Sequence, residues 1–466
     1  MIFLNWKILN YPVHKIGFDY LARLTRKITI MRYSLKNGFF WLFIYILLGL
    51  IPMGIAVAGE IPEFRSFWIE FGVALGFVGL SLFALQFLYS GRFKWIAPRF
   101  GKDNIINFHR EIGITAFFLV MAHPVILILA QPEFLAYFDP TVNFMRAMAL
   151  SFVTVAILLI TVTSIWRITF KLQYEHWRLI HGVLAIAIVF IGVVHAMQVS
   201  HYLEPLWKKI AIAAVMVPAM YLTIHTRLVR PWQNKNRPYT ITDVKEEVGN
   251  CWTLSIKPVG HEKMDYLPGQ FAWITIGPTP FSLQQHPFTF SSSPREPEIK
   301  FTATDDGDFT STWKDIKPGT KVWLEGPFGS FTPKDDSHLF LIMGGIGITP
   351  AMSMLRTMRE DNDPRKAILI YANKEWKDVT FKNELEELSK SIDLNVIHVL
   401  EEPPDGWDGE SGLVSKDLIE KYLPDMPNEF MYYLCGPEPM MDIAGIALYD
   451  LNIKWKRIYM ERFQIV

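Results

Sequence analysis

The chain has 466 residues, of which 46 are Lys or Arg and 46 are Asp or Glu, so its formal net charge is zero. Half of the residues are hydrophobic and the mean hydropathy is +0.19, which excludes a disordered chain because such chains lack the apolar surface to collapse. Zero net charge argues against a basic nucleic-acid-binding protein. The two cysteines, Cys251 and Cys435, exclude a disulfide scaffold, and the length predicts two to four domains of roughly 150 residues.

The zero net charge conceals two unlike halves. Residues 1–237 contain 23 Lys and Arg against 10 Asp and Glu, a net charge of +13, and the remainder carries −13. Complementary charge of this kind favours docking of the two halves on each other.

Six apolar stretches occur in the first half, each long enough to span a hydrocarbon core of about 30 Å as a helix of about 20 residues. They cover residues 38–58, 68–90, 109–130, 144–166, 177–198 and 207–226. On one side of the predicted membrane, the tail 1–37, the connections and the exit after the sixth stretch together carry 18 Lys and Arg. The connections on the opposite side carry 4. The positive-inside rule therefore predicts six membrane helices with both termini cytoplasmic.

The first 37 residues precede these helices and are basic. We expect no cleavable signal peptide, because the first apolar run is too long for the apolar region of such a peptide and follows a long basic tail. The tail either lies on anionic lipid or is simply solvated.

Four histidines form a pattern inside the predicted membrane helices, where ionisable side chains are costly and mark functional sites. His109 and His123 lie 14 residues apart on the third helix, and His181 and His195 lie 14 apart on the fifth. Fourteen positions are close to four full turns and rise about 21 Å, so each pair shares a face. Both helices run from inside to outside, which places His109 level with His181 and His123 level with His195.

A facing pair of imidazoles supplies both axial ligands of a haem, so we predict two haems at two depths. One alternative is four unrelated histidines that bond neighbouring backbone; another is a nucleotide-regulated transporter or proton channel in which the four form a proton relay. His14, His176, His201 and His225 lack such partners and are expected in the tail or near helix ends.

After Pro238 short strand-like runs alternate with turns, which predicts a small antiparallel barrel. These runs are 239–248, 251–257, 271–276, 298–304 and 320–325. From about residue 338 strands alternate with helices, which implies a parallel sheet. Its strands are expected at 338–343, 367–372, 395–400, 430–434 and 457–460.

Two strings in this half suggest nucleotide cofactors. Gly344 to Pro350 reads GGIGITP, follows a strand and opens a helix, an arrangement that lets backbone N–H groups approach a pyrophosphate. His286 to Pro294 reads HPFTFSSSP, in which Phe288 could stack on a flavin and Thr289 could hydrogen-bond it. A Pro-bounded turn with a buried Phe explains the second string equally well.

Together with the histidine pairs, these strings make the chain resemble the ferric reductase/NADPH oxidase superfamily along residues 38–466, of the bacterial type with fused ferredoxin-reductase-type FAD and NAD(P) domains. Further matching motifs are Gly307-Asp-Phe-Thr310, Glu325-Gly-Pro-Phe-Gly329, Cys435-Gly-Pro-Glu-Pro-Met440 and Glu461-Arg-Phe463. The resemblance implies a multidomain membrane protein: a six-helix all-α bundle, an antiparallel β-barrel FAD domain and an α/β Rossmann-like NAD(P) domain. Its parts would be a basic tail (1–37), a di-haem membrane domain (38–230), the FAD barrel (238–336) and the NAD(P) domain (337–466).

The resemblance also implies residue roles. The FAD set would be His286, Pro287, Phe288, Thr289, Ser291, Gly307 and Thr310, and the dinucleotide set would be Gly344, Gly345, Gly347, Thr349 and Pro350. Cys435, Gly436 and Pro437 would lie near the nicotinamide. Phe463 would cover the flavin, although three residues follow it where many relatives end on the aromatic. Cys435 and Phe463 are the expected catalytic residues, and the alternative for each is an ordinary buried apolar position.

The order of these parts predicts an electron path from NAD(P)H through FAD and two b-type haems to an extracytoplasmic acceptor, either dioxygen or ferric iron, with a quinone or a redox protein also open. Related oxidases often carry an Arg on the second helix, but here that helix has no Lys or Arg and Arg65 only precedes it. Lys374 weakly favours NADPH over NADH, though it is equally explained as a solvated loop lysine. We expect an integral protein of the bacterial inner membrane, with the lipid bilayer as its partner, no nucleic acid and no obligate protein partner.

Overall fold

The computed structural model describes residues 40–90, 102–199, 201–334 and 336–462. The chain divides into two compact units, residues 1–48 and 49–466. The following paragraphs concern the second unit, apart from the bounds of the first membrane helix.

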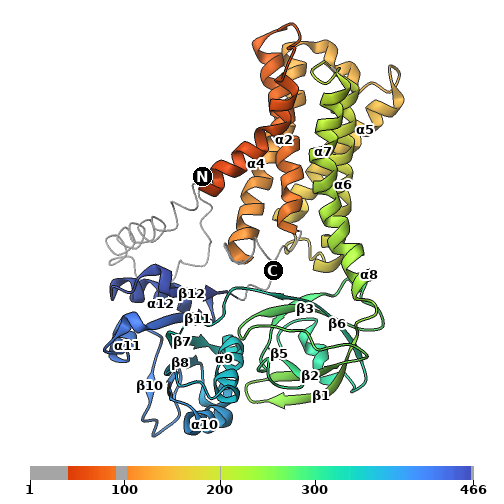
Figure 1. Ribbon diagram of the computed structural model, residues 1–466. Coiled ribbons are helices and arrows are strands. Elements are labelled where there is room, and N and C mark those ends of the chain that lie inside the picture. The colour runs from red at the N-terminus through yellow and green to blue at the C-terminus, as the bar shows by residue number, and fades with distance from the viewer. Residues whose placement is uncertain (1–39, 91–101, 200, 335, 463–466) are drawn as a thin grey trace. The chain divides into compact units, whose positions relative to one another are not determined.

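Six helices are long and apolar enough to cross a membrane, which confirms the prediction (Figure 1). The first is Phe40–Val57. The next four are α2 (Phe67–Ser90), α4 (Lys102–Ala130), α5 (Phe144–Ile165) and α6 (Tyr174–Val199). The sixth begins as α7 (Leu206–Ile224) and continues through a π-helical turn (His225–Val229) into α8 (Arg230–Asn234), so it runs eight residues beyond the predicted end.

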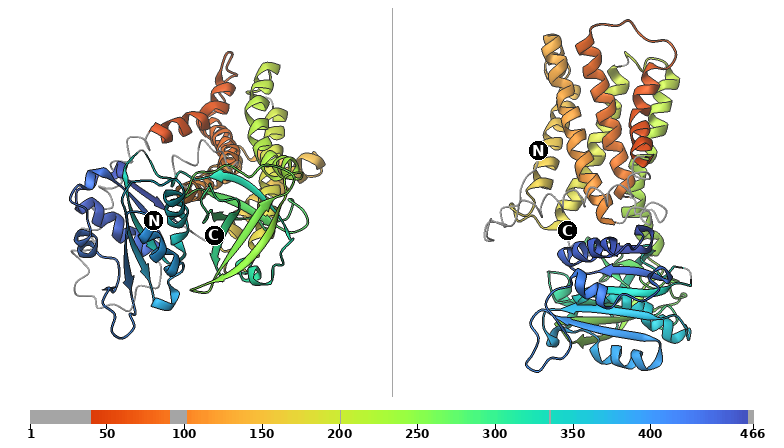
Figure 2. Two further views of the ribbon diagram at one scale, coloured as in Figure 1. Left: turned by 60° about the horizontal axis from the view of Figure 1, so that its bottom comes forward. Right: turned by 90° about the vertical axis from the view of Figure 1, so that its left-hand side faces the viewer.

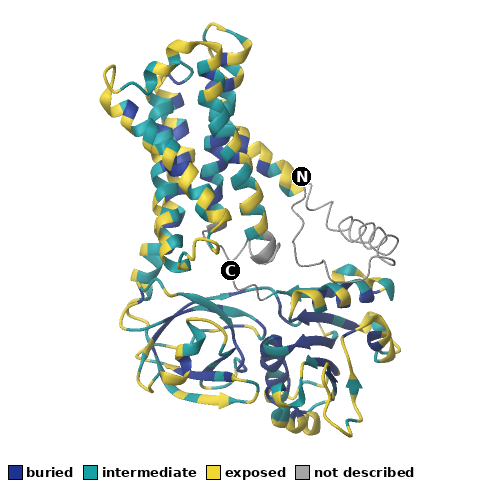
Figure 3. Cartoon of the chain, turned by 180° about the vertical axis from the view of Figure 1, so that it is seen from behind, coloured by how far each residue is buried: buried dark blue, intermediate teal, exposed yellow. Residues whose placement is uncertain are grey.

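The membrane helices keep large apolar side chains on their outer surfaces. Leu129 is 79% exposed and Phe118 is 64% exposed on α4, as expected where lipid rather than protein covers the surface. Figure 3 shows exposed residues along these helices, whereas the central strands of the parallel sheet are mostly buried.

One charged side chain is buried among these helices. Lys208, in the first turn of α7, is 1% exposed, and its Nζ donates to the carbonyl oxygens of Ala56 at 2.8 Å and Glu60 at 3.3 Å. Ala56 lies in the last turn of the first helix, where backbone carbonyls have no intrahelical partner. Lys208 therefore caps that helix from a distant part of the chain.

The first soluble domain is an antiparallel sheet of six strands in the order β4-β3-β6-β1-β2-β5. The strands are β1 (Tyr239–Glu247), β2 (Cys251–Pro258), β3 (Phe271–Ile276), β4 (His286–Thr289), β5 (Ile299–Thr304) and β6 (Lys321–Phe328). The edge strand β5 and the residue after the other edge strand, β4, meet in a single bridge between Phe290 and Phe301. The sheet is thus a curled half-barrel around a core that includes Phe290, Phe301 and Trp313.

The second soluble domain is a parallel sheet in the order β10-β9-β8-β7-β11-β12. Its strands are β7 (His338–Gly344), β8 (Ala367–Asn373), β9 (Leu394–Leu400), β10 (Glu410–Ser411), β11 (Phe430–Cys435) and β12 (Ile458–Glu461). Helices α9 (Thr349–Glu360) and α10 (Lys382–Ser391) bury apolar side chains on one face, and α11 (Lys416–Lys421) and α12 (Glu438–Asp450) on the other (Figure 2). The predicted α/β architecture is confirmed.

The sequence missed two strands. β4 has only four residues, begins with His-Pro and shows no clear alternation. β10 has two residues. Such short edge strands are stabilised by pairing with neighbours rather than by local propensity.

Replacing Lys208 with Met should lower the stability of the membrane part by about 1–3 kcal/mol, because the Ala56 and Glu60 carbonyls lose their buried donor. Thermal unfolding in detergent measures this loss. Lys209→Met is the matched control, because Lys209 is its neighbour and only half-buried. Equal melting temperatures for both variants would contradict the capping role.

Candidate functional site

The two predicted histidine pairs face each other across α4 and α6. The ring centroids of His109 and His181 lie 6.2 Å apart, and those of His123 and His195 lie 6.5 Å apart. An imidazole nitrogen binds a metal at about 2.0–2.1 Å, so two rings on opposite sides of one metal have centroids about 6 Å apart. Both separations therefore fit a six-coordinate metal between the rings.

Hydrogen bonds orient one ring of each pair. His123 Nδ1 donates to the Gly72 carbonyl of α2 at 2.8 Å. His181 Nδ1 lies 3.4 Å from Ser164 Oγ, whose own proton goes to the Ile160 carbonyl at 2.5 Å, so the hydroxyl accepts from the histidine. In both rings Nδ1 carries the proton and Nε2 keeps its lone pair, the arrangement found in metal-ligating histidines.

Two glycines make room at these pairs. A Cβ added to Gly76 of α2 would lie 2.8 Å from His123 Nδ1, so only glycine lets α2 approach this ring. A Cβ at Gly113, one turn after His109 on the same face of α4, would meet no atom within 4 Å. Gly113 therefore leaves this part of the α4 surface uncovered next to the inner pair. No cluster of three or more His, Cys, Asp or Glu side chains that could hold a metal occurs in the described parts of the chain.

A cationic residue lies near the outer pair. Tyr137 packs edge-on against His195 with a centroid separation of 6.1 Å, and the Arg146 guanidinium lies 4.1 Å from the centre of the Tyr137 ring. Arg146 Nη2 donates to the Ala136 carbonyl at 3.3 Å, and its buried Nε has no hydrogen-bond partner among the described residues. Arg65, the cation noted in the sequence, is instead engaged by Glu70, with Nε 3.0 Å from Oε1. Sequence analysis did not link Arg146, in the first turn of α5, to the outer histidine pair.

The flavin motif and the Gly307–Thr310 motif lie together. The His286 ring stacks on Phe309 with centroids 4.3 Å apart, and Phe288 packs on Trp313 at 4.8 Å. Phe288 therefore contacts the barrel core. Thr289, on the opposite face of β4, is 5% exposed and its Oγ1 has no hydrogen-bond partner in the described residues. A buried hydroxyl without a partner fits a ligand that supplies one.

Other residues of the FAD set make hydrogen bonds or turns within the half-barrel itself. Ser291 is fully buried, and its hydroxyl lies 3.0 Å from Thr302 Oγ1. Thr310 Oγ1 accepts the Asp306 amide at 3.3 Å and so shapes the loop that contains Gly307. Gly307 has a φ of +129°, which favours glycine.

The two dinucleotide motifs meet at the carboxyl end of the parallel sheet. A Cβ at Gly347 would lie 2.4 Å from the Cys435 carbonyl oxygen, so the loop touches the Cys435–Pro437 segment through glycine. Tyr371 donates its hydroxyl to the Gly345 carbonyl at 3.2 Å, and burial raises the pKa of that phenol, which keeps its proton. Thr349 Oγ1 donates to the Ile346 carbonyl at 3.1 Å, and Pro350 lies in the first turn of α9.

Among the expected catalytic residues, Cys435 is fully buried at the end of β11, and Phe463 lies outside the described residues. The two dinucleotide motifs thus contact each other, and the functional roles of their residues stay predictions.

The start of α6 contacts the segment that leads into the flavin motif. Arg178 Nη2 donates to the Leu283 carbonyl at 2.6 Å, and Glu175 Oε1 lies 3.5 Å from His286 Nε2. Arg178 is three residues before His181, and Leu283 is three residues before His286. Trp177 packs on His181 with a centroid separation of 5.1 Å. A single helix therefore links the flavin motif to both histidine pairs.

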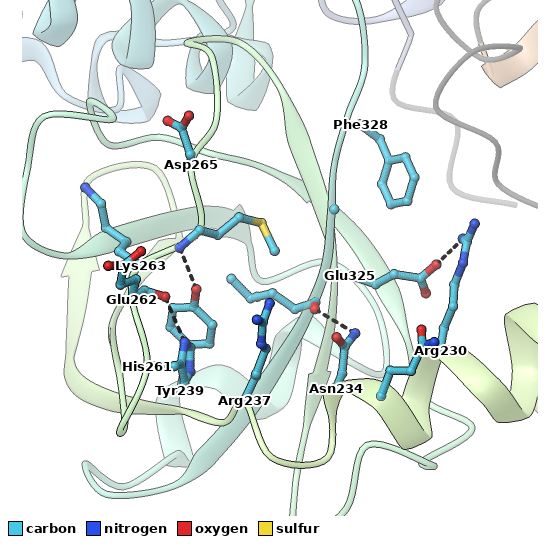
Figure 4. A pocket seen from close by; sticks show the side chains of 14 residues that line it. Arg230, Asn234, Arg237, Tyr239, His261, Glu262, Lys263, Asp265, Glu325 and Phe328 are labelled. Atoms are coloured by element: carbon cyan, nitrogen blue, oxygen red, sulfur yellow. Dashed lines mark hydrogen bonds and ion pairs between the residues drawn. The ribbon is translucent and has the colours of Figure 1, made fainter.

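A cavity of about 670 Å³ lies between α8 and the half-barrel (Figure 4). Arg230 Nη1 lies 2.6 Å from Glu325 Oε1 at its edge, and Asn234 Nδ2 donates to the Leu324 carbonyl at 3.2 Å. These contacts tie the end of the sixth membrane helix to β6. The cavity contains none of the residues assigned to FAD or nicotinamide.

Three family models match consecutive parts of the chain. A ferric reductase-like transmembrane component matches residues 75–192, an FAD-binding domain matches 249–332, and an oxidoreductase NAD-binding domain matches 341–445. In this order, the three matches correspond to a fusion of the ferric reductase/NADPH oxidase type. The FAD-binding match includes the segment from His286 to Thr310, and the NAD-binding match includes both dinucleotide motifs.

Curated relatives match about a third of the chain. NADH-cytochrome b5 reductase 1 of Aspergillus terreus is 33% identical over 155 residues, which cover 31% of this chain and 52% of that protein. The plasma membrane-associated coenzyme Q6 reductase PGA3 of Saccharomyces cerevisiae is 31% identical over 155 residues, which cover 32% and 49%. The chain therefore spans about half the length of the curated relatives it matches. Among solved structures, the FAD/NAD-binding domain of nitric oxide dioxygenase from Vibrio cholerae has 21% identity and a TM-score of 0.45, with coverage of 49% and 99%.

Replacing Thr289 with Val should weaken FAD retention about fivefold, because the variant cannot make the hydrogen bond that we assign to this hydroxyl. FAD content after gel filtration in detergent measures the effect. Thr275→Val, a buried threonine on the neighbouring strand β3, is the control. Loss of FAD from both variants alike would contradict a specific role for Thr289.

Proposed function

We propose that this chain carries electrons across a membrane, from NAD(P)H in the cytoplasm through FAD and two b-type haems to an acceptor on the other side. The observation that carries the proposal is the pair of facing histidine sites, 6.2 and 6.5 Å between centroids, on helices of the ferric reductase-like component. The soluble half matches FAD- and NAD-binding domains, and its curated relatives are named as NADH-dependent and coenzyme Q reductases.

Two histidines on one iron leave no open coordination position, which suits electron transfer rather than ligand chemistry. His109 and His181 would hold the inner haem, and His123 and His195 the outer one. Flavin, when bound, accepts a two-electron hydride and releases single electrons, so it joins the nicotinamide to iron. Thr289 and the Gly307–Thr310 loop would hold that flavin beside the start of α6.

The direction of transfer follows from charge. Basic residues gather at the connections on the side of the soluble domains, which the positive-inside rule assigns to the cytoplasm. NAD(P)H is then oxidised inside and the acceptor is reduced outside.

For the nucleotide, the surroundings of Lys374 favour NADH over the NADPH that the sequence weakly suggested. Lys374 Nζ lies 3.4 Å from Glu402 Oε1, and both side chains are more than half exposed. Glu402, which follows β9, places a carboxylate beside Lys374 and so opposes the 2′-phosphate that distinguishes NADPH, whereas a carboxylate suits a free ribose.

For the acceptor, Arg146 near the outer histidine pair favours a small anion or a product that becomes one. It makes no ion pair within the described residues, so its charge is not neutralised by a neighbouring carboxylate. Superoxide formed from dioxygen and an anionic ferric chelate both fit this chemistry.

Replacing His123 with Ala should remove the outer haem and halve the haem-to-FAD ratio, while FAD binding survives, because the flavin motif does not contact this residue. Pyridine haemochrome and FAD assays on purified protein measure the ratio. His176→Ala, at an exposed position of the same α6 that carries His181, is the control. An unchanged haem content in His123→Ala would show that the ligand pairing is wrong.

Replacing Arg146 with Gln should slow acceptor reduction about tenfold or more, because the positive charge near the outer pair is lost, while the histidine ligands stay in place and haem content and haem reduction by NADH are retained. Proteoliposome assays of superoxide and of Fe(II), each with and without superoxide dismutase, measure the rate and identify the acceptor. Arg65→Gln is the control, because Arg65 is already paired with Glu70. Equal rates for both variants would contradict the role of Arg146.

A further inference from the structure

Helix α9 presents three polar side chains to the segment that follows the flavin motif. Ser353, Arg356 and Thr357 occupy positions i, i+3 and i+4 and so share one face of the helix. Their partners are Ser291, Ser292 and Ser293, three successive residues that are all fully buried. This line of contacts joins the FAD domain to the NAD domain.

Arg356 is the centre of this line. It is 6% exposed, its Nη1 donates to the Ser291 carbonyl, and its Nε and Nη2 lie 2.7 and 2.6 Å from the two Glu384 carboxylate oxygens. The guanidinium also lies 5.0 Å from the centre of the Phe381 ring. Burial opposes ionisation of Glu384, but the hydrogen bonds and charge of Arg356 prevail and lower the pKa of its carboxyl. The pair therefore stays ionised at neutral pH.

The flanking contacts strengthen the connection. Ser353 Oγ donates to the Ser292 carbonyl at 2.7 Å. Thr357 Oγ1 donates to the Ser353 carbonyl at 2.6 Å and lies 3.2 Å from Ser293 Oγ, from which it accepts. On the other side, the Ser291 amide donates to the Lys300 carbonyl at 2.8 Å and the Phe290 amide to the Gln270 carbonyl at 3.0 Å. The segment 291–293, which α9 contacts, is thus held on the half-barrel by backbone hydrogen bonds directly after Thr289.

The other end of α9 begins at the dinucleotide loop. Gly344 to Ile348 precede Thr349, the first residue of the helix, and Arg356 is seven residues further, about 10 Å along the axis. One rigid helix therefore connects the pyrophosphate loop to the strand that carries the flavin motif.

We propose that Arg356 is a positioning residue that sets the distance between the bound nicotinamide and the flavin. It contacts the flavin segment at the Ser291 carbonyl, and it is connected to the dinucleotide loop through α9. It acts in this way only if NAD(P)H reduces FAD, as proposed above. Reacting atoms in a productive complex lie about 3–3.5 Å apart, and a displacement of about 1 Å costs on the order of 100-fold in rate.

Lysine cannot replace this arginine in the same geometry. The guanidinium holds three acceptors with a planar fork, whereas an ammonium group is a point charge without the bidentate geometry. Arg356→Lys keeps a positive charge beside the Glu384 carboxylate but removes the planar guanidinium that makes the bidentate hydrogen bonds. Arg359→Lys is the matched control, because Arg359 lies three residues further on α9, is partly exposed and pairs with Glu360 at 3.3 Å.

The test uses the full-length protein in detergent, loaded with FAD. Stopped-flow mixing with NADH gives the limiting rate of flavin reduction, NAD⁺ titration gives nucleotide affinity, and the long-wavelength charge-transfer band of reduced flavin with NAD⁺ reports ring overlap. Amide hydrogen exchange at 291–293, measured without nucleotide, reports the contact itself. A purely structural role would change melting temperature and FAD content but leave the limiting rate of intact molecules unaltered.

For Arg356→Lys we expect a limiting rate about 10–100-fold lower, a weaker charge-transfer band and faster exchange at 291–293, with NAD⁺ affinity and FAD content within about threefold. Arg359→Lys should match the wild type. A wild-type limiting rate and band in Arg356→Lys would overturn the positioning role alone. Failure of NADH to reduce the wild-type flavin would overturn the proposed function as well.

If Arg356→Lys does not fold, Ser353→Ala takes its place. It removes only the bond to the Ser292 carbonyl and leaves no unpaired charge, so we expect about a fivefold slower reduction. An unchanged rate together with unchanged exchange at 291–293 would overturn the role of this face of α9.

Discussion

Two pairs of imidazoles, each about 6 Å apart, constrain the membrane half of this molecule. Both pairs need α4 and α6 to run in the same direction, at the same level and with the same faces turned inward. A shift of one helix by a single residue would turn the rings about 100° away from each other. The approach of α2 through Gly76 and the bond from His123 to the Gly72 carbonyl hold this arrangement from outside the pair.

Helix α6, which carries one histidine of each pair, also contacts the soluble half. Its first turns contact the flavin segment through Arg178 and Glu175, and its later turns carry His181 and His195. The half-barrel in turn holds α9 through Ser291, and α9 begins at the dinucleotide loop. A chain of direct contacts therefore runs from the nucleotide loop to the outer histidines. We regard this continuity as the physical basis for proposing electron transfer rather than two independent activities.

Sequence reasoning predicted the periodic and apolar features well. The six membrane helices, the four facing histidines and most strands follow from hydrophobic length, helical spacing and alternation, which are local properties. It missed β4 and the extension of the sixth helix through a π-helical turn, because both depend on tertiary contacts, such as Arg230 with Glu325. It also missed Arg146 and Arg356. Their partners lie on other elements, and nothing in the local pattern distinguishes them from ordinary helix-end and surface arginines.

The central claim is that electrons pass from NADH to iron held by the four histidines. Anaerobic titration of the purified full-length protein with NADH, followed by absorption spectroscopy, tests it most directly. We predict a strong Soret band in the oxidised protein, about two haems per FAD, and a shift of that band to the reduced form as the flavin bleaches. A protein that binds FAD but shows no Soret band, despite a normal haem supply during expression, would contradict the claim and favour a proton relay by the same histidines.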